Sequence, residues 1–267
     1  MGRRKDQVTL MDLQLSGKVA IVTGASRGIG RAIAQALAAE GMKLALVARS
    51  RDQLEELRTS IPTECLVQAV DLKEPAVAPA VVAATLARFA HLDLLVNNAG
   101  STRRGDFLAL PDSDWDEGFG LKFFGAMRCC RAAWPHLRAT GGSIINIVGI
   151  GGRTATAEFT IGGAVNSALL NLTKALADRG VKDGVRVNAI NPGSIATDRL
   201  QARLRGFASE HHVDLAKAEE QMARALGVAR FGEPSEIARV VAFLASAQAT
   251  YCHGAIVDVD GGQTRTL

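Results

Sequence analysis

Aromatic residues are scarce in this chain. They make up 4% of its 267 residues, and Tyr251 is the single tyrosine. This tyrosine precedes the last predicted strand, far from the segments discussed below. Chemistry that uses a tyrosine hydroxyl anywhere else in the chain is therefore excluded.

Cysteine and histidine are also few, and they lack metal-binding spacing. The four cysteines Cys65, Cys129, Cys130 and Cys252 form no CxxC pair and no Cys/His cluster. The five histidines are scattered, without acidic partners at ligand spacing. We expect reduced, packed thiols and no metal site.

Long apolar runs are missing, and neither sign of charge dominates. No stretch reaches the roughly 18 apolar residues of a membrane span, and the basic start has no apolar core behind it. The 31 basic residues are interspersed with 27 acidic ones, without a basic stripe interleaved with aromatics. We expect a cytoplasmic protein that binds neither membrane nor nucleic acid, and whose slight positive charge suits an anionic small molecule.

Apolar strand patterns alternate with helix patterns along nearly the whole chain. The strands are KVAIVTG, KLALVA, CLVQAV, LDLLVN, SIINIV, VRVNAI and AIVDVD, and the helices cover 28–40, 51–59, 76–90, 113–138, 163–178 and 234–246. This alternation predicts an α/β protein with a doubly wound parallel sheet. We expect a flexible tail over 1–10, one domain over 11–267, and a polar helical substrate lid over about 198–229.

The first strand leads into a helix through the segment TGASRGIG. Glycines at 24, 28 and 30 allow a tight turn and a close approach of the backbone to a ligand. The unpaired N–H groups at the start of that helix favour negative charge. Because the motif lies between the first strand and the first helix, it predicts a site for a dinucleotide pyrophosphate.

Two later motifs complete a resemblance. NNAG at 97–100 and NPGSIAT at 191–197 follow the glycine loop in an order that resembles the short-chain dehydrogenase/reductase family, over residues 15–263. The resemblance implies a Rossmann fold, hydride transfer with NAD(P), and dimers or tetramers. By the same resemblance Asp71 and Leu72 face the adenine, Asn98, Ala99 and Gly100 support the centre of the cofactor, and Pro192 to Thr197 hold the nicotinamide amide.

Charge at the end of the second strand indicates which cofactor is used. An acid there would bind a free ribose 2'-hydroxyl, but this strand ends Val47-Ala48-Arg49. Arg27 and Arg49 are able to converge on a 2'-phosphate. We therefore predict NADP(H), the alternative being a solvated Arg49 and NAD. The predicted cofactor-binding residues are Gly24, Ser26, Arg27, Gly28, Ile29, Gly30, Arg49, Asp71, Leu72, Asn98, Ala99, Gly100, Asn166, Pro192, Gly193, Ile195 and Thr197.

The catalytic residues of the resembled family are not in their usual places. That family uses an Asn, a Ser, a Tyr and a Lys, and here the matching positions are Lys122, Gly149, Gly162 and Asn166. A positioned general acid accelerates a reaction about 100 to 10,000-fold, so its loss cripples reduction of a simple ketone. An iminium or an electron-poor alkene needs less protonation.

Three functions remain open from the sequence. The first is an NADP-dependent oxidoreductase with a rebuilt active site and a small-molecule substrate. The second is a lyase or isomerase on the same fold, and the third is a catalytically silent NADP(H)-binding sensor or partner subunit. The preserved phosphate loop argues against non-redox chemistry, which needs no dinucleotide.

Lys122 and Asn166 look like an exchange of the family's Asn and Lys. An apolar stripe directs Lys122 inward on its helix, and its members are Trp115, Phe119, Lys122, Ala126, Cys129 and Ala133. We hypothesise that Asn166 holds the nicotinamide ribose hydroxyls and that buried Lys122 supplies a charge or proton. The alternatives are that Lys122 reaches a polar edge or pairs with Glu117 or Asp116, and that Asn166 caps a helix.

Further residues near the expected cleft receive weaker expectations. Arg103 and Arg104 follow NNAG and suit an anionic substrate, or are a solvated loop pair; the other polar candidates are Arg153, Thr154, Glu158, Thr160 and Ser194. Missing side chains predict a wide pocket, at Gly149, Gly151, Gly152, Gly162 and Gly163. Glycines at 118, 120 and 125 in one helix indicate close packing, and with the resemblance they predict a homo-oligomer, a tetramer above all.

Overall fold

Among the described residues, seven parallel strands form one sheet in the order β3-β2-β1-β4-β5-β6-β7. The computed structural model describes residues 11–265, so the expected tail over 1–10 lies outside the described part. The strands are β1 (Val19–Thr23), β2 (Lys43–Ala48), β3 (Cys65–Ala69), β4 (Leu94–Asn97), β5 (Ser143–Ile147), β6 (Arg186–Pro192) and β7 (Ile256–Val259). Their continuous apolar runs are typical of strands covered on both faces.

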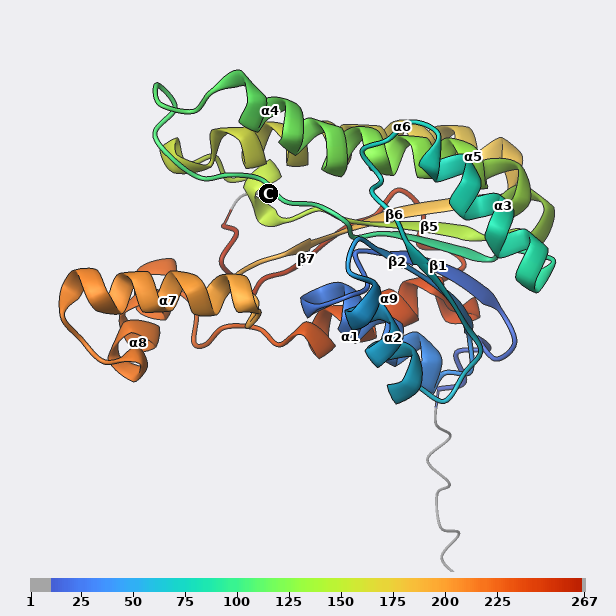
Figure 1. Ribbon diagram of the computed structural model, residues 1–267, viewed down its shortest axis with the longest axis horizontal. Coiled ribbons are helices and arrows are strands. Elements are labelled where there is room, and N and C mark those ends of the chain that lie inside the picture. The colour runs from blue at the N-terminus through green and yellow to red at the C-terminus, as the bar shows by residue number, and fades with distance from the viewer. Residues whose placement is uncertain (1–10, 266–267) are drawn as a thin grey trace, which may run out of the picture.

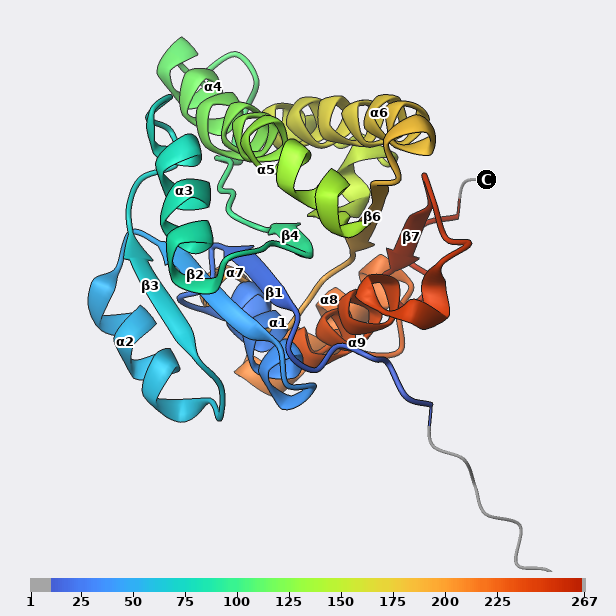
Figure 2. The ribbon, with the colours of Figure 1, turned by 90° about the vertical axis from the view of Figure 1, so that its right-hand side faces the viewer.

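Helices cover both faces of this sheet (Figures 1 and 2). They are α1 (Gly28–Ala39), α2 (Arg51–Ser60), α3 (Val77–Phe89), α4 (Asp112–Gly118), α5 (Ala126–Thr140), α6 (Thr160–Asp183), α7 (Asp198–His211), α8 (Leu215–Leu226) and α9 (Pro234–Ala245). One core lies between the sheet and α1, α2 and α9, and a second joins the sheet to α3 and α5. The prediction of a doubly wound α/β fold is confirmed.

The strand order reverses direction at β1. This strand pairs with β2 on one side and with β4 on the other. In an open parallel sheet, such a reversal leaves a crevice at the carboxyl ends of the strands. The loops after β1, β4, β5 and β6 therefore meet at one edge, and all the sequence motifs lie on them.

The helix predicted over 113–138 is interrupted by a π-helix. The segment η1 (Phe119–Gly125) has π-helical hydrogen bonding and separates α4 from α5. A π-turn takes up one extra residue and is frequent at functional sites. Glycines at both ends leave room for it: Gly118 lies against Ile161, with 2.7 Å between the Ile161 Cγ2 methyl and a Cβ built at 118. The glycine packing is thus within the chain.

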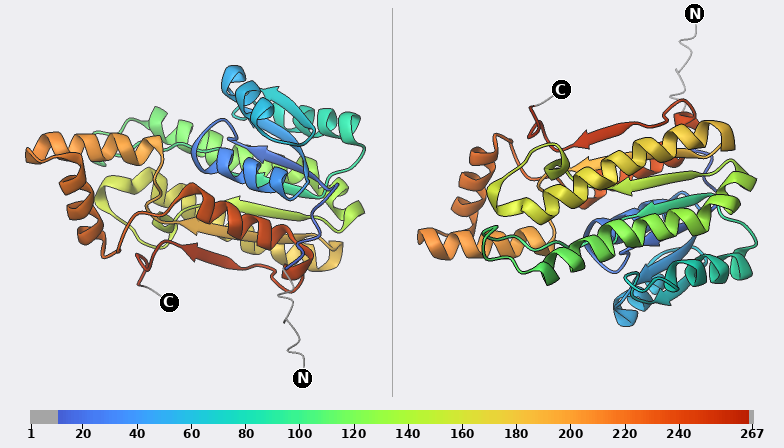
Figure 3. Two further views of the ribbon diagram at one scale, coloured as in Figure 1. Left: turned by 90° about the horizontal axis from the view of Figure 1, so that it is seen from below. Right: turned by 90° about the horizontal axis from the view of Figure 1, so that it is seen from above.

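The predicted lid is a pair of helices with its own small core. α7 and α8 pack through Leu200, Leu204 and Met222, joined by Phe231. Figure 3 shows both helices projecting beyond the sheet at one end of the molecule. Leu215, the first residue of α8, lies outside this core and is 49% exposed.

The cysteines are free thiols, two of them buried and two partly buried. Burial raises the pKa of Cys129 and of Cys130 to about 12, so both are inert at neutral pH. No group of three His, Cys, Asp or Glu side chains suited to a metal ion occurs within 11–265. In the same range, no helix is both long enough and apolar enough to cross a membrane.

Candidate active site

The glycine loop after β1 has the geometry of a phosphate cradle. Gly24 and Gly28 have positive φ of 66° and 56°, which glycine adopts without strain. A Cβ on Gly30 would collide with the Gly24 carbonyl oxygen, so only glycine lets α1 start this close to the loop. The first N–H groups of α1 consequently open toward the crevice, where a pyrophosphate fits.

Asn98 and Ala99 hold this loop from the end of β4. The Asn98 Nδ2 group donates to the carbonyl oxygens of Thr23 and Gly24, at 3.1 and 3.2 Å. The backbone N–H groups of Asn98 and Ala99 both donate to Thr23 Oγ1, at 2.9 and 3.1 Å. The NNAG motif therefore fixes the shape of the cradle.

Arg27 and Arg49 lie at neighbouring strand ends. The Ala25 N–H donates to the Val47 carbonyl at 3.2 Å, which joins the glycine loop to the end of β2. Both arginines are exposed, and neither forms an ion pair with another described residue. At the end of β3, Asp71 accepts from the Lys73 N–H at 3.0 Å, and Leu72 is buried. The cationic pair is free to meet a 2'-phosphate.

The NPGSIAT segment closes the crevice from β6. The Ala196 N–H donates to the Gly232 carbonyl at 2.7 Å, and the Gly193 N–H donates to the Val259 carbonyl at 3.1 Å. Ile195 pairs with Gly232 in the same connection. Thr197 precedes α7, and its methyl lies 3.3 Å from a Cβ built at Gly28. The loops after β1 and β6 thus meet beside the cradle.

Lys122 reaches the centre of the site from the π-helix. Its Nζ donates to the Val148 carbonyl oxygen at 2.5 Å, at the end of β5. Its methylene stem packs on Gly100 of the NNAG motif, 2.9 Å from a Cβ built there. Desolvation, reinforced by the charge of Arg199, lowers the pKa of Lys122 to about 7. The contacts with Val148 and Gly100 confirm the prediction that Lys122 points inward. Glu117, which was an alternative partner of Lys122, lies 4.0 Å from Lys73.

Asn166 lies inside α6 and is 2% exposed. Its Nδ2 donates to the Gly149 carbonyl at 3.4 Å, while its Oδ1 has no hydrogen-bond partner among the described residues. A helix-capping role is thereby wrong. A buried acceptor of this kind normally has a partner, and a ribose hydroxyl of a dinucleotide fits that requirement.

Phe159 fills the place of the missing tyrosine. A Cβ at Gly162 would collide with the Phe159 ring, and one at Gly151 would lie 2.7 Å from it. Leu170 and the Asn166 backbone similarly occupy the space beside Gly152. The prediction of a widened pocket is therefore wrong here, because neighbouring side chains have taken the space that the glycines leave.

Gly149, at the family's serine place, has a backbone unsuited to serine. Its φ of 122° and ψ of 145° are a combination that is essentially restricted to glycine. The Gly149 N–H donates to Asn191 Oδ1 at 3.3 Å. The turn after β5 is thus shaped for glycine, and a serine there would strain it.

Several polar candidates from the sequence are occupied elsewhere. Arg153 forms an ion pair with Asp258 at 2.6 Å, and Arg103 lies 3.5 Å from Asp114. The Ser194 hydroxyl donates to Gln263 at 3.4 Å. Only Arg104 of this group stacks toward the site, its guanidinium carbon 4.0 Å from the Phe159 ring centre.

Sequence reasoning missed three residues that shape this region: Phe159, Arg199 and Arg203. Arg199 on α7 donates to the Gly100 carbonyl at 3.3 Å, which brings the lid to the NNAG motif. The i, i+4 spacing of the two arginines was a signal for a common helix face. Nothing in the sequence pointed to Phe159, because its role depends on the turn that precedes α6.

The sheet and its glycine cradle define a dinucleotide-binding protein of the Rossmann class. A family model described as "Enoyl-(Acyl carrier protein) reductase" matches residues 24–264. A 3-oxoacyl-[acyl-carrier-protein] reductase of Staphylococcus aureus is 35% identical over 254 residues, covering 92% of this chain and 97% of that protein. The chain belongs to the short-chain dehydrogenase/reductase family.

Solved structures agree with this assignment. L-sorbose reductase from Gluconobacter frateurii, complexed with NADPH and L-sorbose, has a TM-score of 0.92 and 36% identity, over 96% of this chain and all of that one. YwfH, an NADPH-dependent reductase involved in bacilysin biosynthesis, has a TM-score of 0.87 and 29% identity, over 94% of this chain and 99% of that one.

Proposed function

We propose that the chain is an NADP(H)-dependent oxidoreductase with a rebuilt proton-transfer site. Its substrate is a small molecule whose hydride acceptor needs little protonation, foremost an electron-poor alkene. The family match, the unpaired arginines beside the cradle and the NADPH-dependent relatives support the cofactor assignment. We further propose that residues 11–267 act as one domain in a cytoplasmic homotetramer.

One observation carries the choice of substrate. The Phe159 ring occupies the volume beside Gly162 in which a tyrosine side chain would begin. A hydroxyl donor at that position would require displacement of the ring. Ketone reduction in the family's usual manner therefore lacks its acid, whereas an enone activates its own β-carbon toward hydride.

Lys122 is the group best placed to supply the missing proton. It lies between Gly100 and Val148, and its pKa of about 7 makes both protonation states available at neutral pH. NADPH, when bound, supplies the hydride that the alkene accepts. Lys122 Nζ–H then stabilises the developing enolate and, directly or through water, delivers the proton to its α-carbon, so that one hydride and one proton complete the reduction.

Asn166 and the NNAG motif position the partners. In our proposal Asn166 Oδ1 accepts from a nicotinamide ribose hydroxyl, since it is a buried acceptor without a partner. The cradle held by Asn98 fixes the other end of the dinucleotide. Holding two reactants in the reactive geometry lowers the activation barrier by about 7 to 11 kcal/mol. Hydride transfer in the site therefore stays much faster than in solution even without the usual acid.

A paired substrate panel tests the proposed function. NADPH oxidation is followed by absorbance with 4-hexen-3-one and with 3-hexanone, which share a carbon skeleton and differ in the alkene. We expect turnover of the enone at least about tenfold faster than of the ketone. Faster reduction of the ketone would contradict the proposal. If the chain binds NADPH but does not oxidise it with any member of a wider enone panel, a sensor is favoured. If it converts a substrate without consuming NADPH, a lyase or isomerase is favoured.

A further inference from the structure

Positive charge gathers where the lid meets the substrate side of the site. Arg104 extends from the loop after NNAG, and Arg199 and Arg203 extend from α7. Within the described residues none of the three forms an ion pair. Arg103, Arg153 and Arg230, in contrast, are each paired with a carboxylate. In this part of the chain Arg104, Arg199 and Arg203 are thus unpaired guanidinium groups on the lid side of the site, as Arg27 and Arg49 are on the cofactor side.

These arginines face a common space. Arg199 and Arg203 are four residues apart and lie on one side of α7, while Leu200 and Leu204 of the same helix are buried in the lid core. Arg199 donates to the Gly100 carbonyl at 3.3 Å, and the Arg104 guanidinium carbon lies over the Phe159 ring, 4.0 Å from its centre. Stacking orients the planar guanidinium and leaves its edge free to donate hydrogen bonds.

The positive charges of these arginines act on one another. The pKa of Arg104 is lowered by desolvation first and by the charges of Arg203 and Arg199 next, against a smaller opposing effect of Glu158. The pKa of Arg199 is lowered by desolvation and by Arg27. Like charges held together in this way destabilise one another until an anion binds between them. The proximity of Arg199 to Arg27 also assigns Arg199 partly to the cofactor side.

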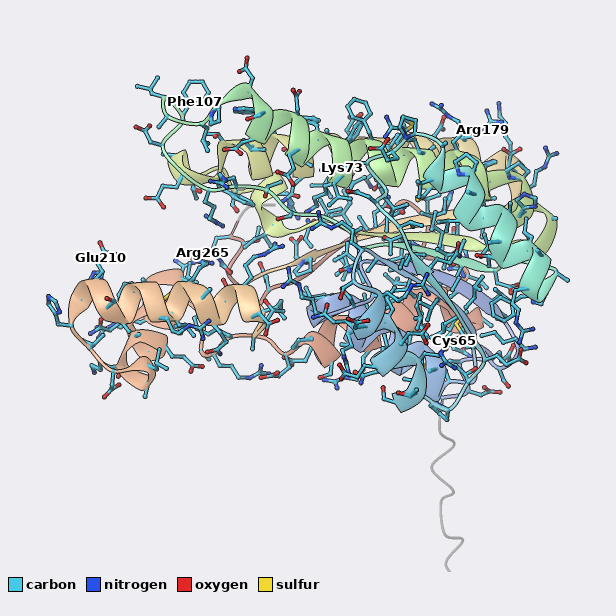
Figure 4. All side chains as sticks on the ribbon, in the orientation of Figure 1. Cys65, Lys73, Phe107, Arg179, Glu210 and Arg265 are labelled. Carbon is cyan, nitrogen blue, oxygen red and sulfur yellow. The ribbon has the colours of Figure 1, made fainter. Side chains whose placement is uncertain are left out.

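We propose that Arg104 and Arg203, with Arg199 behind them, form a subsite for an anionic oxygen group of the substrate, a carboxylate or a phosphate. This inference rests on the proposed function only for the identity of the reacting alkene. Guanidinium forks bind either anion through paired hydrogen bonds. The lid, which carries two of the arginines, is thereby drawn toward the loop after NNAG when the substrate enters. In Figure 4, Phe107 on that loop and Glu210 on α7 lie at the same end of the molecule.

The test uses binding to the full chain saturated with NADP+, so that it does not require turnover. The probes are trans-4-oxo-2-pentenoate, its methyl ester and inorganic phosphate, and calorimetry measures each affinity. We expect the acid to bind at least about tenfold more tightly than the ester. Inorganic phosphate and acetate then compete with the bound acid. If phosphate displaces the acid at the lower concentration, the subsite is assigned to phosphate; if acetate does so, it is assigned to carboxylate. Equal affinities of acid and ester would overturn the proposal.

Matched variants connect the effect to the two arginines. Arg104→Gln and Arg203→Gln should each weaken acid binding about tenfold, change ester binding less than about twofold, and leave NADP+ affinity within about threefold. Arg103→Gln and Arg205→Gln are the controls, because Arg103 is paired with Asp114 and Arg205 lies about 200° around the helix from Arg203. Acid binding that is unchanged in both test variants, or equally weakened in the controls, would refute the subsite. If the wild-type chain binds the acid more tightly than the ester but does not oxidise NADPH with any enone, the proposed function is refuted and the subsite is not.

Discussion

Lys122 stands at the position of the family's catalytic asparagine, although the motifs around it match the family. Its neighbours are Gly100, in the NNAG motif, and Val148, directly after β5. Lys122 thus places an amine group at the centre of the site, and we propose that this amine determines which substrates the chain reduces.

Lys122→Met should lower kcat at least about a hundredfold on any substrate found, because it removes the proton donor and keeps the apolar stem. Affinity for NADPH should stay within about threefold, since the cradle is untouched. Steady-state kinetics and a fluorescence titration of NADPH measure the two quantities. Turnover near that of the wild type would remove Lys122 from the mechanism.

The pH dependence follows from the same residue. Burial and Arg199 lower the pKa of Lys122 to about 7, and the proposed donor is its protonated form. The value of kcat/KM should therefore be highest at low pH and fall as pH rises through about 7. In Lys122→Arg the cation persists, since the guanidinium pKa is above about 12, and this limb should disappear. A limb retained in the arginine variant would assign it to another group.

Gly162→Ala tests the packing of the Phe159 ring. Alanine favours a helix interior by about 1 kcal/mol, but here its Cβ collides with the ring. Overpacking of this kind costs about 1 to 3 kcal/mol, so the free energy of unfolding should fall. Gly206→Ala is the control, because Gly206 lies in α7 with nothing within 4 Å of its Cβ position. Urea denaturation should give Gly206→Ala a larger free energy of unfolding than Gly162→Ala. Equal free energies of unfolding for the two variants would disprove the collision.

At the scale of elements, the π-helix and the strand ends set the geometry. The π-turn of η1 stands between α4 and α5 and carries Lys122 toward β5. The parallel pairing of β1 with β2 brings the glycine loop beside the end of β2. In our proposal, two neighbouring loops, which carry Arg27 and Arg49, together determine the choice of cofactor.

NADPH should bind at least about tenfold more tightly than NADH, a difference of about 1.4 kcal/mol. Arg49→Glu should abolish this preference, because a carboxylate there repels a 2'-phosphate and accepts from a free hydroxyl. Arg58→Glu makes the same change of charge at the far end of α2, where Arg58 pairs with Glu55 at 2.6 Å, and should leave the preference intact. Calorimetry of both cofactors decides between these outcomes, and equal affinities in the wild type would contradict the assignment.

At the scale of the whole molecule, the assembly stays a prediction. The glycines that suggested it pack within the chain, Gly118 against Ile161 and Gly125 against the Leu72 carbonyl, so they no longer argue for a partner. The prediction of a homotetramer now rests on the family resemblance alone, which implies dimers or tetramers. Phe124 on η1 is 41% exposed, and Arg128 lies over its ring at 5.6 Å.

Light scattering at micromolar concentration should give about four times the chain mass of 28.1 kDa. The physical reason is that an exposed aromatic on a helical face gains stability when a symmetric copy covers it. Phe124→Asp should lower the mass, and Phe243→Asp, an exposed phenylalanine on α9, serves as its control. A monomeric wild type would disprove the assembly.

The fold and the conformation of the glycine loop could be predicted from the amino-acid sequence. Its strands are continuous apolar runs, without the alternation of apolar and polar residues that a half-exposed strand shows, and amphipathic helices separate them. Few folds other than a doubly wound parallel sheet accommodate this pattern. The glycines of TGASRGIG identify the cradle because only glycine permits their φ values and the contact between Gly30 and Gly24. The inward direction of Lys122 followed from its place in an apolar stripe.

The side chains that fill the space beside Gly162 could not be predicted from local sequence patterns. Phe159 and Gly162 are three residues apart, yet their contact depends on the turn that begins α6, and no periodicity reports it. The π-helix is likewise flanked by long-range contacts, of Gly118 with Ile161 and of Gly125 with the Leu72 carbonyl, which no local pattern reports. The arginines of the lid meet Arg104 across about 95 residues of chain, because the loops after β4 and β6 end at one edge of the sheet. Local pattern fixes which elements form, whereas long-range packing decides which side chains share a cleft.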